Sequence, residues 1–343
     1  MGLYGGFDLH SNNSYLGIKN EEGTVVFGKR LKNNKQLIID TLEPFRADMK
    51  ELCVESTYNW YWLADLLEDN DYNIKLANPL AIQQYKGMKN ANDKTDAFWL
   101  AEMLRLGILP TGHIHKREER SVRDLLRRRM AFVQQRVEHK LSLMSLFERV
   151  FGVRVANDKI INENYDIDEN DMDPCVKFHI DSLIRAIEGL TSIIVDIEDK
   201  VLSMTKDDPA YDNLSTIPGV GKILSMTIIL ETGDISRFKK VANYTSYCRC
   251  TDAKRTSNGK VKGKNLSKCG NKYLSWAFSE AASGCIRSCE EARRFRDRKL
   301  KGKDQKVLAN RSLATKLCKA AFYIVRDQTP FSVEKCFGYE LEK

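Results

Sequence analysis

The first 106 residues alternate short segments with a strand-like pattern and longer segments with a helical pattern. The strand-like segments, in which apolar and polar residues alternate or an apolar run ends in a polar residue, fall at 3–8, 14–19, 24–29, 52–55 and 73–77. The helical segments fall at about 33–48, at about 60–70 and from residue 93 onwards. The order begins strand, strand, strand, helix, strand, helix, and it predicts an α/β domain.

Four carboxylates occupy special positions in this order. Asp8 ends the first strand, Glu55 ends the fourth, and Asp93 and Asp96 open the third helix. A spacing of three residues places these two aspartates on one helix face. Carboxylate oxygens are the ligands that Mg²⁺ prefers, and two such ions can hold the attacking and leaving oxygens of a phosphodiester.

The placement of these acids matters more than their number, because a chain with 47 acidic residues contains many sets of four. Their positions are similar to those of the metal ligands in an RNase H-like domain, which also has this order of elements. The four acids are therefore candidate ligands for Mg²⁺ or Mn²⁺ on an RNase H-like domain over residues 1–115.

Composition narrows the class of protein. A chain of 343 residues is long enough for two or three domains. No apolar run of 18 residues and no signal-peptide pattern occurs, so we expect a cytoplasmic protein with no membrane contact. The nine cysteines are irregularly spaced, and Cys248, Cys250 and Cys269 lack nearby histidines or a CxxC pair. Free thiols in a reducing compartment are therefore expected rather than structural zinc.

Positive charge is concentrated between residues 237 and 306, which hold 20 Lys or Arg against 6 Asp or Glu. Because the whole chain is only +8, the remainder is net acidic. Such a block indicates nucleic-acid binding, although a solvated surface is the simpler alternative. The candidate contacts, in this block and beyond it, are Arg127, Lys222, Lys254, Arg255, Lys260, Lys262, Lys264 and Lys268.

Two long helices with a four-three apolar spacing are expected between residues 116 and 207. One begins near Glu118 and the other runs from Val176 to Val201. This spacing predicts an antiparallel coiled-coil hairpin. Its connecting segment, 157–173, holds seven carboxylates and one lysine and is expected to be an exposed, mobile loop. Arginines along the first helix, Arg127 among them, are either ordinary flanking residues or nucleic-acid contacts.

The last part of the chain, 208–343, reads as mainly helical, with helices at about 272–289 and 304–327. Residues 215–222, Ser-Thr-Ile-Pro-Gly-Val-Gly-Lys, resemble a helix-hairpin-helix turn, whose glycines let backbone amides approach a phosphate. Ser257 lies in a turn rich in Gly and Asn, among Lys254, Arg255 and Lys260. Such a serine is a candidate nucleophile whose transition state the cations would stabilise, although most serines in such turns have no catalytic role.

Motifs along nearly the whole chain resemble those of the DEDD transposases of insertion sequences, the bridge-RNA-guided recombinases. In the N-terminal part these are Gly-Phe-Asp-Leu-His at 6–10, Val-Glu-Ser-Thr at 54–57 and Asp-Lys-Thr-Asp-Ala at 93–97. In the C-terminal part they are Ile-Pro-Gly-Val-Gly at 217–221, Gly-Asp-Ile-Ser-Arg-Phe at 233–238, Ser257, and Ser-Lys-Cys-Gly-Asn at 267–271. The resemblance implies a RuvC-like α/β domain, the coiled-coil hairpin, and a mainly α transposase domain.

The same resemblance implies a function. It implies a DNA transposase that cleaves and rejoins double-stranded donor and target DNA, guided by a structured non-coding RNA, near the prokaryotic nucleoid. Asp8, Glu55, Asp93 and Asp96 would bind the metal, and Ser257 would form a covalent 5′-phosphoserine link to DNA. Strand exchange implies dimers that assemble into a tetramer, with the coiled coil as the subunit contact.

The chain departs from the family pattern around the serine. The family has Ser-Gly where this chain has Ser257-Asn258-Gly259, which leaves Thr256 as a competing nucleophile. The usual Gly-Leu-x-Pro is replaced around residues 249–252, and Ser275 stands in place of an arginine. Two alternative functions remain. One is a RuvC-like structure-specific nuclease that uses metal-activated water, and the other is a non-catalytic, decayed transposase, against which the four intact carboxylates argue.

Overall fold

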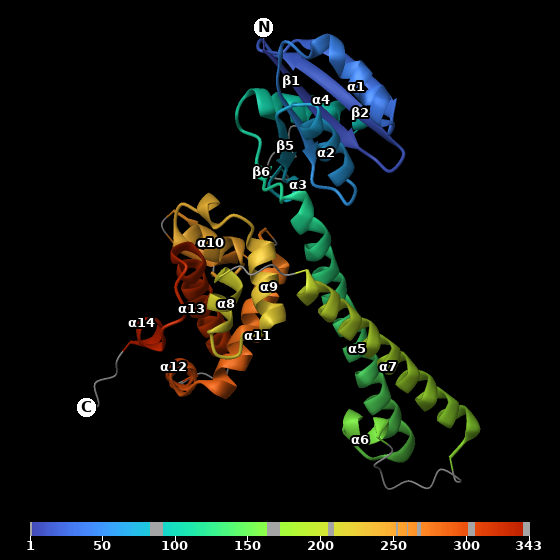
Figure 1. Ribbon diagram of the computed structural model, residues 1–343, viewed down its shortest axis with the longest axis vertical. Coiled ribbons are helices and arrows are strands. Elements are labelled where there is room, and N and C mark those ends of the chain that lie inside the picture. Colours follow the sequence, from blue (N-terminus) through green and yellow to red (C-terminus); the bar gives the residue numbers. More distant parts are fainter. Residues whose placement is uncertain are drawn as a thin grey trace. The chain divides into compact units, whose positions relative to one another are not determined.

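A computed structural model describes residues 2–82, 92–162, 172–204, 209–251, 253–258, 260–265, 269–300 and 306–338. The chain divides into two compact units, residues 1–115 and 116–343. Each unit is described by itself below, and Figure 1 labels its elements. Among the helices in these described ranges, none is both long enough and apolar enough to cross a membrane.

The first unit is built on a six-stranded mixed sheet with the order β3-β2-β1-β4-β5-β6. The central strands β1, β4 and β5 are parallel, while β2, β3 and β6 run antiparallel to their neighbours. This α/β arrangement is consistent with the predicted RNase H-like domain. The strands are β1 (Leu3–Leu9), β2 (Asn13–Asn20), β3 (Val25–Lys32), β4 (Met49–Glu55), β5 (Ile74–Ala77) and β6 (Thr111–Gly112).

Helices cover both faces of this sheet. Helices α1 (Lys35–Leu42) and α2 (Tyr61–Asp69) pack on one face, against a core that includes Phe7 and Val54. Helix α4 (Asp93–Arg105) packs on the other, against Cys53. Two short elements complete the unit, the helix α3 (Pro79–Ile82) and the 3₁₀ helix η1 (Glu43–Phe45). Helix α1 is shorter than the predicted 33–48, because Pro44 at the start of η1 cannot continue an α-helix.

Three glycines in register let α4 approach the sheet closely. Gly6 pairs with Gly17 on the neighbouring strand, and Gly17 pairs with Gly28 on the next. A Cβ on Gly6 would lie 2.4 Å from the carbonyl oxygen of Ala97 in α4, and a Cβ on Gly17 or Gly28 would meet the ring of Phe98 at 2.7 or 2.6 Å. This glycine row therefore fixes the position of α4 over β1 to β3.

The second unit begins with two long antiparallel helices, α5 (Arg117–Phe151) and α7 (Pro174–Ser203), which lie side by side (Figure 1). The early part of α5 packs on the late part of α7, as Leu126 and Val201 share one core. The predicted spacing holds in α7, whose buried residues recur every seven positions at Ile180, Ile187, Ile194 and Val201. The helical pair agrees with the prediction, while supercoiling of the pair stays a prediction.

The connection between α5 and α7 is not simply the exposed loop that its charge predicts. Residues 157–161 form α6 (Asn157–Ile161), whose Ile160 is fully buried with Leu143 and Phe147 of α5. Burial of Ile160 and Ile161 at this end of the helical pair stabilises α6 despite the acidic composition of the segment. Residues 163–171, which belong to the predicted mobile loop, lie outside the described residues.

The rest of the second unit is mainly helical, as predicted, around a core that includes the fully buried Tyr244 and Phe278. The two-stranded hairpin within it was not predicted. The elements of this part of the second unit are α8 (Pro209–Ser215), α9 (Lys222–Thr232), η4 (Ile235–Arg237), α10 (Val241–Tyr247), β7 (Ala253–Ser257), β8 (Lys260–Asn265), α11 (Lys272–Ser288), α12 (Glu290–Leu300), α13 (Lys306–Asp327) and α14 (Val333–Phe337).

The nine cysteines are free thiols, as predicted from their spacing. Burial raises the pKa of Cys285 to about 12 and that of Cys336 to about 11. These two thiols stay protonated near neutral pH.

Candidate active site

Asp8 and Glu55 lie at the carboxyl ends of two neighbouring parallel strands. In β1 and β4, Phe7 pairs with Val54, and the two acids are the next residues along each strand. Because side chains alternate between the faces of a sheet, both acids project to the face opposite Phe7 and Val54. That face is the one covered by α4.

Asp93 and Asp96 lie in the first turn of α4. The helix begins where it does because Asn92 and Thr95 form a capping box, in which the Asn92 side chain accepts from Thr95 N at 2.9 Å and Asn92 N donates to Thr95 Oγ1 at 3.1 Å. The helix dipole stabilises carboxylates at this end. The N-terminus of α4 therefore presents two acids on the same sheet face as Asp8.

Two of the predicted acids come together with a histidine. His10 Nε2 lies 3.2 Å from Asp8 Oδ2 and 3.4 Å from Asp93 Oδ1. One potential metal-binding atom from each of these three residues lies within 4.8 Å of the other two. Arg30 Nη2 donates to Asp93 Oδ2 at 2.6 Å. Sequence reasoning missed the roles of His10 and Arg30, although His10 stands in the motif around Asp8.

The pKa values of the two acids shift in opposite directions. Partial burial raises the pKa of Asp8 above its ordinary value of 3.8; His10 lowers it, and the negative charges of Asp96 and Asp93 raise it. The hydrogen bond from Arg30 has the largest effect on Asp93 and lowers its pKa. Burial opposes this with a smaller effect, and the charge of His10 lowers the pKa further. The raised pKa of Asp8 thus reflects mainly burial, to which the negative charges of Asp96 and Asp93 add, and a bound cation would favour the charged carboxylate against both effects.

The chemistry of these donors fits a divalent cation. Carboxylate oxygens from Asp8 and Asp93 lie close together, and Asp96 is near enough to affect the pKa of Asp8. Mg²⁺ and Mn²⁺ both prefer such oxygen ligands, and a histidine nitrogen is an additional ligand that Mn²⁺ accepts. Glu55 would join from the neighbouring strand end.

Ser257 is the last residue of β7, at the tip of the β7–β8 hairpin. It pairs with Lys260, and Asn258 follows it directly in the chain. Asn258 has a φ of 52°, and Asn-Gly is the preferred sequence of the tight type I′ hairpin turn, which needs positive φ. The departure from the family's Ser-Gly therefore matches a local demand of the hairpin. The side chains of residues 253–257 lie outside the described structure.

The predicted nucleic-acid contacts fall into several environments. Lys222, Lys260 and Lys262 are exposed, and in the hairpin backbone Lys254 pairs with Lys264 and Arg255 with Gly263. Arg127 is instead held inside the unit, where its Nη2 donates to Glu231 Oε2 at 2.8 Å and its guanidinium lies 4.4 Å from the Tyr273 ring centroid. Its nucleic-acid contact stays a prediction. Lys268 lies outside the described residues.

The Pro-Gly turn at 217–221 is more structural than its motif suggests. Gly219 has a φ of 84°, and a Cβ there would lie 2.3 Å from the backbone carbon of Gly284 in α11. This glycine allows close packing of the turn on α11, and the access of a phosphate to the turn stays a prediction. A Cβ on Gly221, the N-cap residue of α9, would meet no atom within 4 Å.

A buried carboxylate that sequence reasoning missed joins α5 to the C-terminal helices. Glu231 is 2% exposed and accepts from Arg123 at 2.9 Å, from Arg127, and from Asn271 Nδ2 at 2.7 Å. Asn271 also caps α11 by accepting from Tyr273 N and Leu274 N. The signal in the sequence was the Gly-Asn motif at 270–271, which this network explains as a structural element.

Comparisons with known proteins bear on the two halves of the chain separately. A DEDD transposase profile of the IS110 type matches residues 5–152, which include the four acids, and the profile of the transposase IS116/IS110/IS902 family matches residues 211–297, which include Ser257. The chain is also 22% identical over 273 residues to the transposase for insertion sequence element IS1328 of Yersinia enterocolitica, covering 78% of this chain and 79% of that protein.

The chain belongs to the IS110 family of DEDD transposases. The two matches do not overlap and follow the order expected from the motifs. The IS110-family assignment makes the chain a transposase of an insertion sequence, with DNA as its substrate. It also implies a divalent metal, in agreement with the chemistry of the Asp8 and Asp93 cluster.

Proposed function

We propose that this IS110-family transposase cleaves and rejoins DNA through a serine nucleophile and a divalent-metal site, guided by a structured RNA. Asp8, Glu55, Asp93 and Asp96 are the proposed metal ligands and Ser257 is the proposed nucleophile. The observation that carries the proposal is the close approach of Asp8 and Asp93 at the carboxyl edge of the parallel strands, in a chain that matches both halves of this family.

The proposed reaction exchanges one phosphate ester for another. The Ser257 oxygen attacks the DNA phosphorus, the bond to the 3′ oxygen breaks, the serine hydroxyl gives up its proton, and the released 3′ oxygen takes one up. The 5′ phosphate is then esterified to the serine. A 3′ hydroxyl of another strand attacks this ester in the reverse sense and frees the serine. Because each step forms as many phosphate esters as it breaks, rejoining needs no external energy source.

The residues of the chain prepare this reaction by charge and position. A divalent cation, when bound, would neutralise negative charge on the reacting phosphate and polarise its oxygens. Asp8 and Glu55 would hold it from rigid strand ends, and Asp93 and Asp96 from the first turn of α4. The cations of the β7–β8 hairpin would stabilise charge that develops during attack at Ser257.

A guide RNA would supply sequence specificity in this proposal. Base pairing would select donor and target DNA, while the protein would bind backbone and RNA shape. The family resemblance and the basic block at 237–306 support this part. Transposition assays with and without the non-coding RNA of the element test it, with a base-scrambled RNA of equal length as control. Equal recombination with all three preparations would contradict RNA guidance.

Replacement of Ser257 tests the nucleophile. Wild type, Ser257→Ala and Thr256→Ala are incubated with end-labelled DNA, Mg²⁺ and guide RNA, then denatured and separated by electrophoresis. We expect label to migrate with wild type and with Thr256→Ala, and none with Ser257→Ala, because only Ser257 would form the covalent ester. Circular dichroism confirms that the variants are folded.

The other outcomes of this experiment are equally informative. An adduct that persists in Ser257→Ala and disappears in Thr256→Ala moves the nucleophile by one residue. Efficient cleavage by wild type without any adduct, even on nicked substrates that trap it, overturns the serine mechanism and favours a nuclease that uses metal-activated water.

A further inference from the structure

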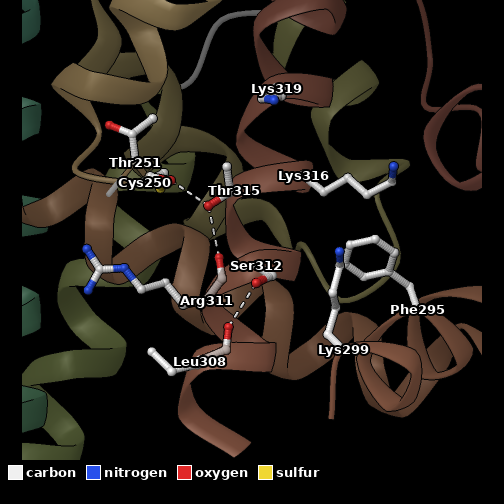
Figure 2. Close-up of a pocket in the computed structure, with 10 residues that line it drawn as sticks. All are labelled: Cys250, Thr251, Phe295, Lys299, Leu308, Arg311, Ser312, Thr315, Lys316 and Lys319. Carbon is white, nitrogen blue, oxygen red and sulfur yellow. Dashed lines mark hydrogen bonds between the residues drawn. The ribbon is translucent and has the colours of Figure 1, made fainter. Parts of the chain in front are cut away.

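A cavity of about 610 Å³ lies between α12, α13 and the segment that leads into β7 (Figure 2). Helix α12 contributes Phe295 and Lys299, and Cys250 and Thr251 precede the hairpin. The lining residues of α13 recur at helical spacing from Leu308 to Lys319, so that they form one face of that helix. This face is rich in cations and hydroxyls rather than in apolar residues.

The cavity is strongly cationic. Lys299, Arg311, Lys316 and Lys319 line it, and no carboxylate occurs among its ten lining residues in the part of the chain that the structure describes. Within the described part of the chain, none of these four cations has an ion-pair partner, whereas other cations of the same helices do. Arg294 pairs with Glu290 in α12, for example. The cavity therefore concentrates positive charge that the described residues leave unneutralised.

The positions of two of these ammonium groups are supported by an aromatic ring. Lys316 Nζ lies 5.1 Å and Lys299 Nζ lies 5.7 Å from the centroid of the Phe295 ring. Such cation–π contacts favour keeping both charges at the cavity. The ring itself also offers an apolar surface to the sugar or base next to a phosphate.

The cavity wall is hydrogen-bonded to the segment that precedes the strand ending at Ser257. Thr315 Oγ1 lies 2.5 Å from the carbonyl oxygen of Cys250, and Arg311 Nη2 donates to the carbonyl oxygen of Arg249 at 3.4 Å. Cys250 is buried and lies three residues before the start of β7. A ligand in this cavity would thus lie beside the base of the hairpin.

We infer that this cavity binds the phosphodiester backbone of a DNA strand and positions it next to the β7–β8 hairpin. The inference depends on the proposed function in one respect, namely that the ligand is DNA. Cations whose described neighbours in the cavity include no acid, an arginine that can donate two parallel hydrogen bonds, and an adjacent aromatic ring form a site for a phosphate with its sugar. The volume is that of a small-ligand pocket, so it admits a single backbone segment and excludes a duplex.

The test compares two double variants that each remove two positive charges. Lys299→Ala with Lys319→Ala changes two exposed residues of the cavity, and Lys239→Ala with Arg287→Ala changes two exposed residues outside it. Binding of a short fluorescein-labelled DNA single strand is measured by anisotropy over a range of NaCl concentrations. The cavity variant is expected to lower the slope of log K against log salt by between one and two units, and the control to change it less.

Charge, rather than shape, should carry the effect, so Lys299→Arg with Lys319→Arg is expected to keep most of the wild-type slope. A cavity variant that behaves like the control overturns the inference, and so does a defect that appears only with RNA of the same sequence. The two proposals can fail separately. If wild type forms no serine adduct but the cavity variant still loses DNA affinity, the proposed nucleophile is wrong and the cavity inference holds.

Discussion

At the scale of single residues, Glu231 shows how one buried carboxylate positions two helices. It neutralises Arg123 and Arg127 of α5 and binds the cap residue of α11. Burial raises its pKa, but the hydrogen bond from Arg127 and the charges of both arginines outweigh this effect, and the pKa lies below the ordinary 4.5. Glu231 is therefore ionised in the folded protein near neutral pH.

We predict that Glu231→Gln lowers the free energy of unfolding by roughly 3 kcal/mol at pH 7, because it removes the buried negative charge that Arg123 and Arg127 share. Since the pKa is lower in the folded than in the unfolded state, this contribution is present above pH 4.5 and is lost as pH falls through the folded-state pKa. Urea unfolding of both proteins from pH 7 to pH 3 measures it. A stability difference that stays constant over that range would contradict the assignment.

Asp8 is the residue at which the proposed metal should act most strongly. Burial and the neighbouring aspartates raise its pKa, and like charges about 4 Å apart repel by about 4 kcal/mol at an effective dielectric constant near 20. We predict that Mg²⁺ raises the Tm of wild type, and that Asp8→Asn reduces this shift and abolishes cleavage. Asp40→Asn, at an exposed residue of α1, is the matched control. Full strand transfer by Asp8→Asn in Mg²⁺ would exclude a metal role for this residue.

At the scale of elements, the glycine row determines where the acids of α4 lie. The helix contacts the sheet through Ala97 and Phe98, where only glycine leaves room. The first turn of the same helix carries Asp93 and Asp96. Packing at the middle of α4 thereby sets the distance between these acids and Asp8.

We predict that Gly6→Ala destabilises the protein by about 1–3 kcal/mol through overpacking and also lowers metal-dependent cleavage, because α4 must move away from β1. Gly189→Ala in α7 is the control, since no atom lies within 4 Å of a Cβ built there. It is expected to be neutral or stabilising by up to about 1 kcal/mol. Urea unfolding and a cleavage assay measure the two effects. A fully active and stable Gly6→Ala protein would show that α4 tolerates the shift.

Elements with a clear period were predictable from the sequence, and elements formed by polar residues were not. Strands β1, β2 and β4 alternate apolar and polar residues or end an apolar run, which identified Asp8 and Glu55 as strand-end acids. The hairpin strand 253–257, Ala-Lys-Arg-Thr-Ser, has no apolar face, so its sequence does not predict a strand. His10 and Arg30 join the acids only through the pairing of β1, β2 and β3, which a linear sequence does not reveal.

At the scale of the whole molecule, the proposed dimers and tetramers need a surface for subunit contact, and the α5–α7 pair supports one. Val137 and Leu141, one helical turn apart on α5, are 47% and 60% exposed, and Phe178 and Val195 of α7 are 67% and 48% exposed. Apolar area of this kind stabilises an assembly by about 25 cal/mol for each Å² removed from water.

We predict that wild type forms the proposed dimers and that Val137→Glu with Leu141→Glu converts them into monomers, because two charges would be buried in an apolar contact. The matched control is Gln134→Glu with Ser145→Glu, which adds the same charge at exposed polar positions of the same helix and should leave the dimer intact. Sedimentation velocity at several protein concentrations gives the mass of each protein, and circular dichroism tests that α5 remains folded. If the apolar-face variant has the mass of the wild-type dimer, this surface is not the subunit contact. If the apolar-face variant is monomeric and fails to recombine DNA, while the control is dimeric and recombines DNA, then assembly through α5 is required for strand exchange.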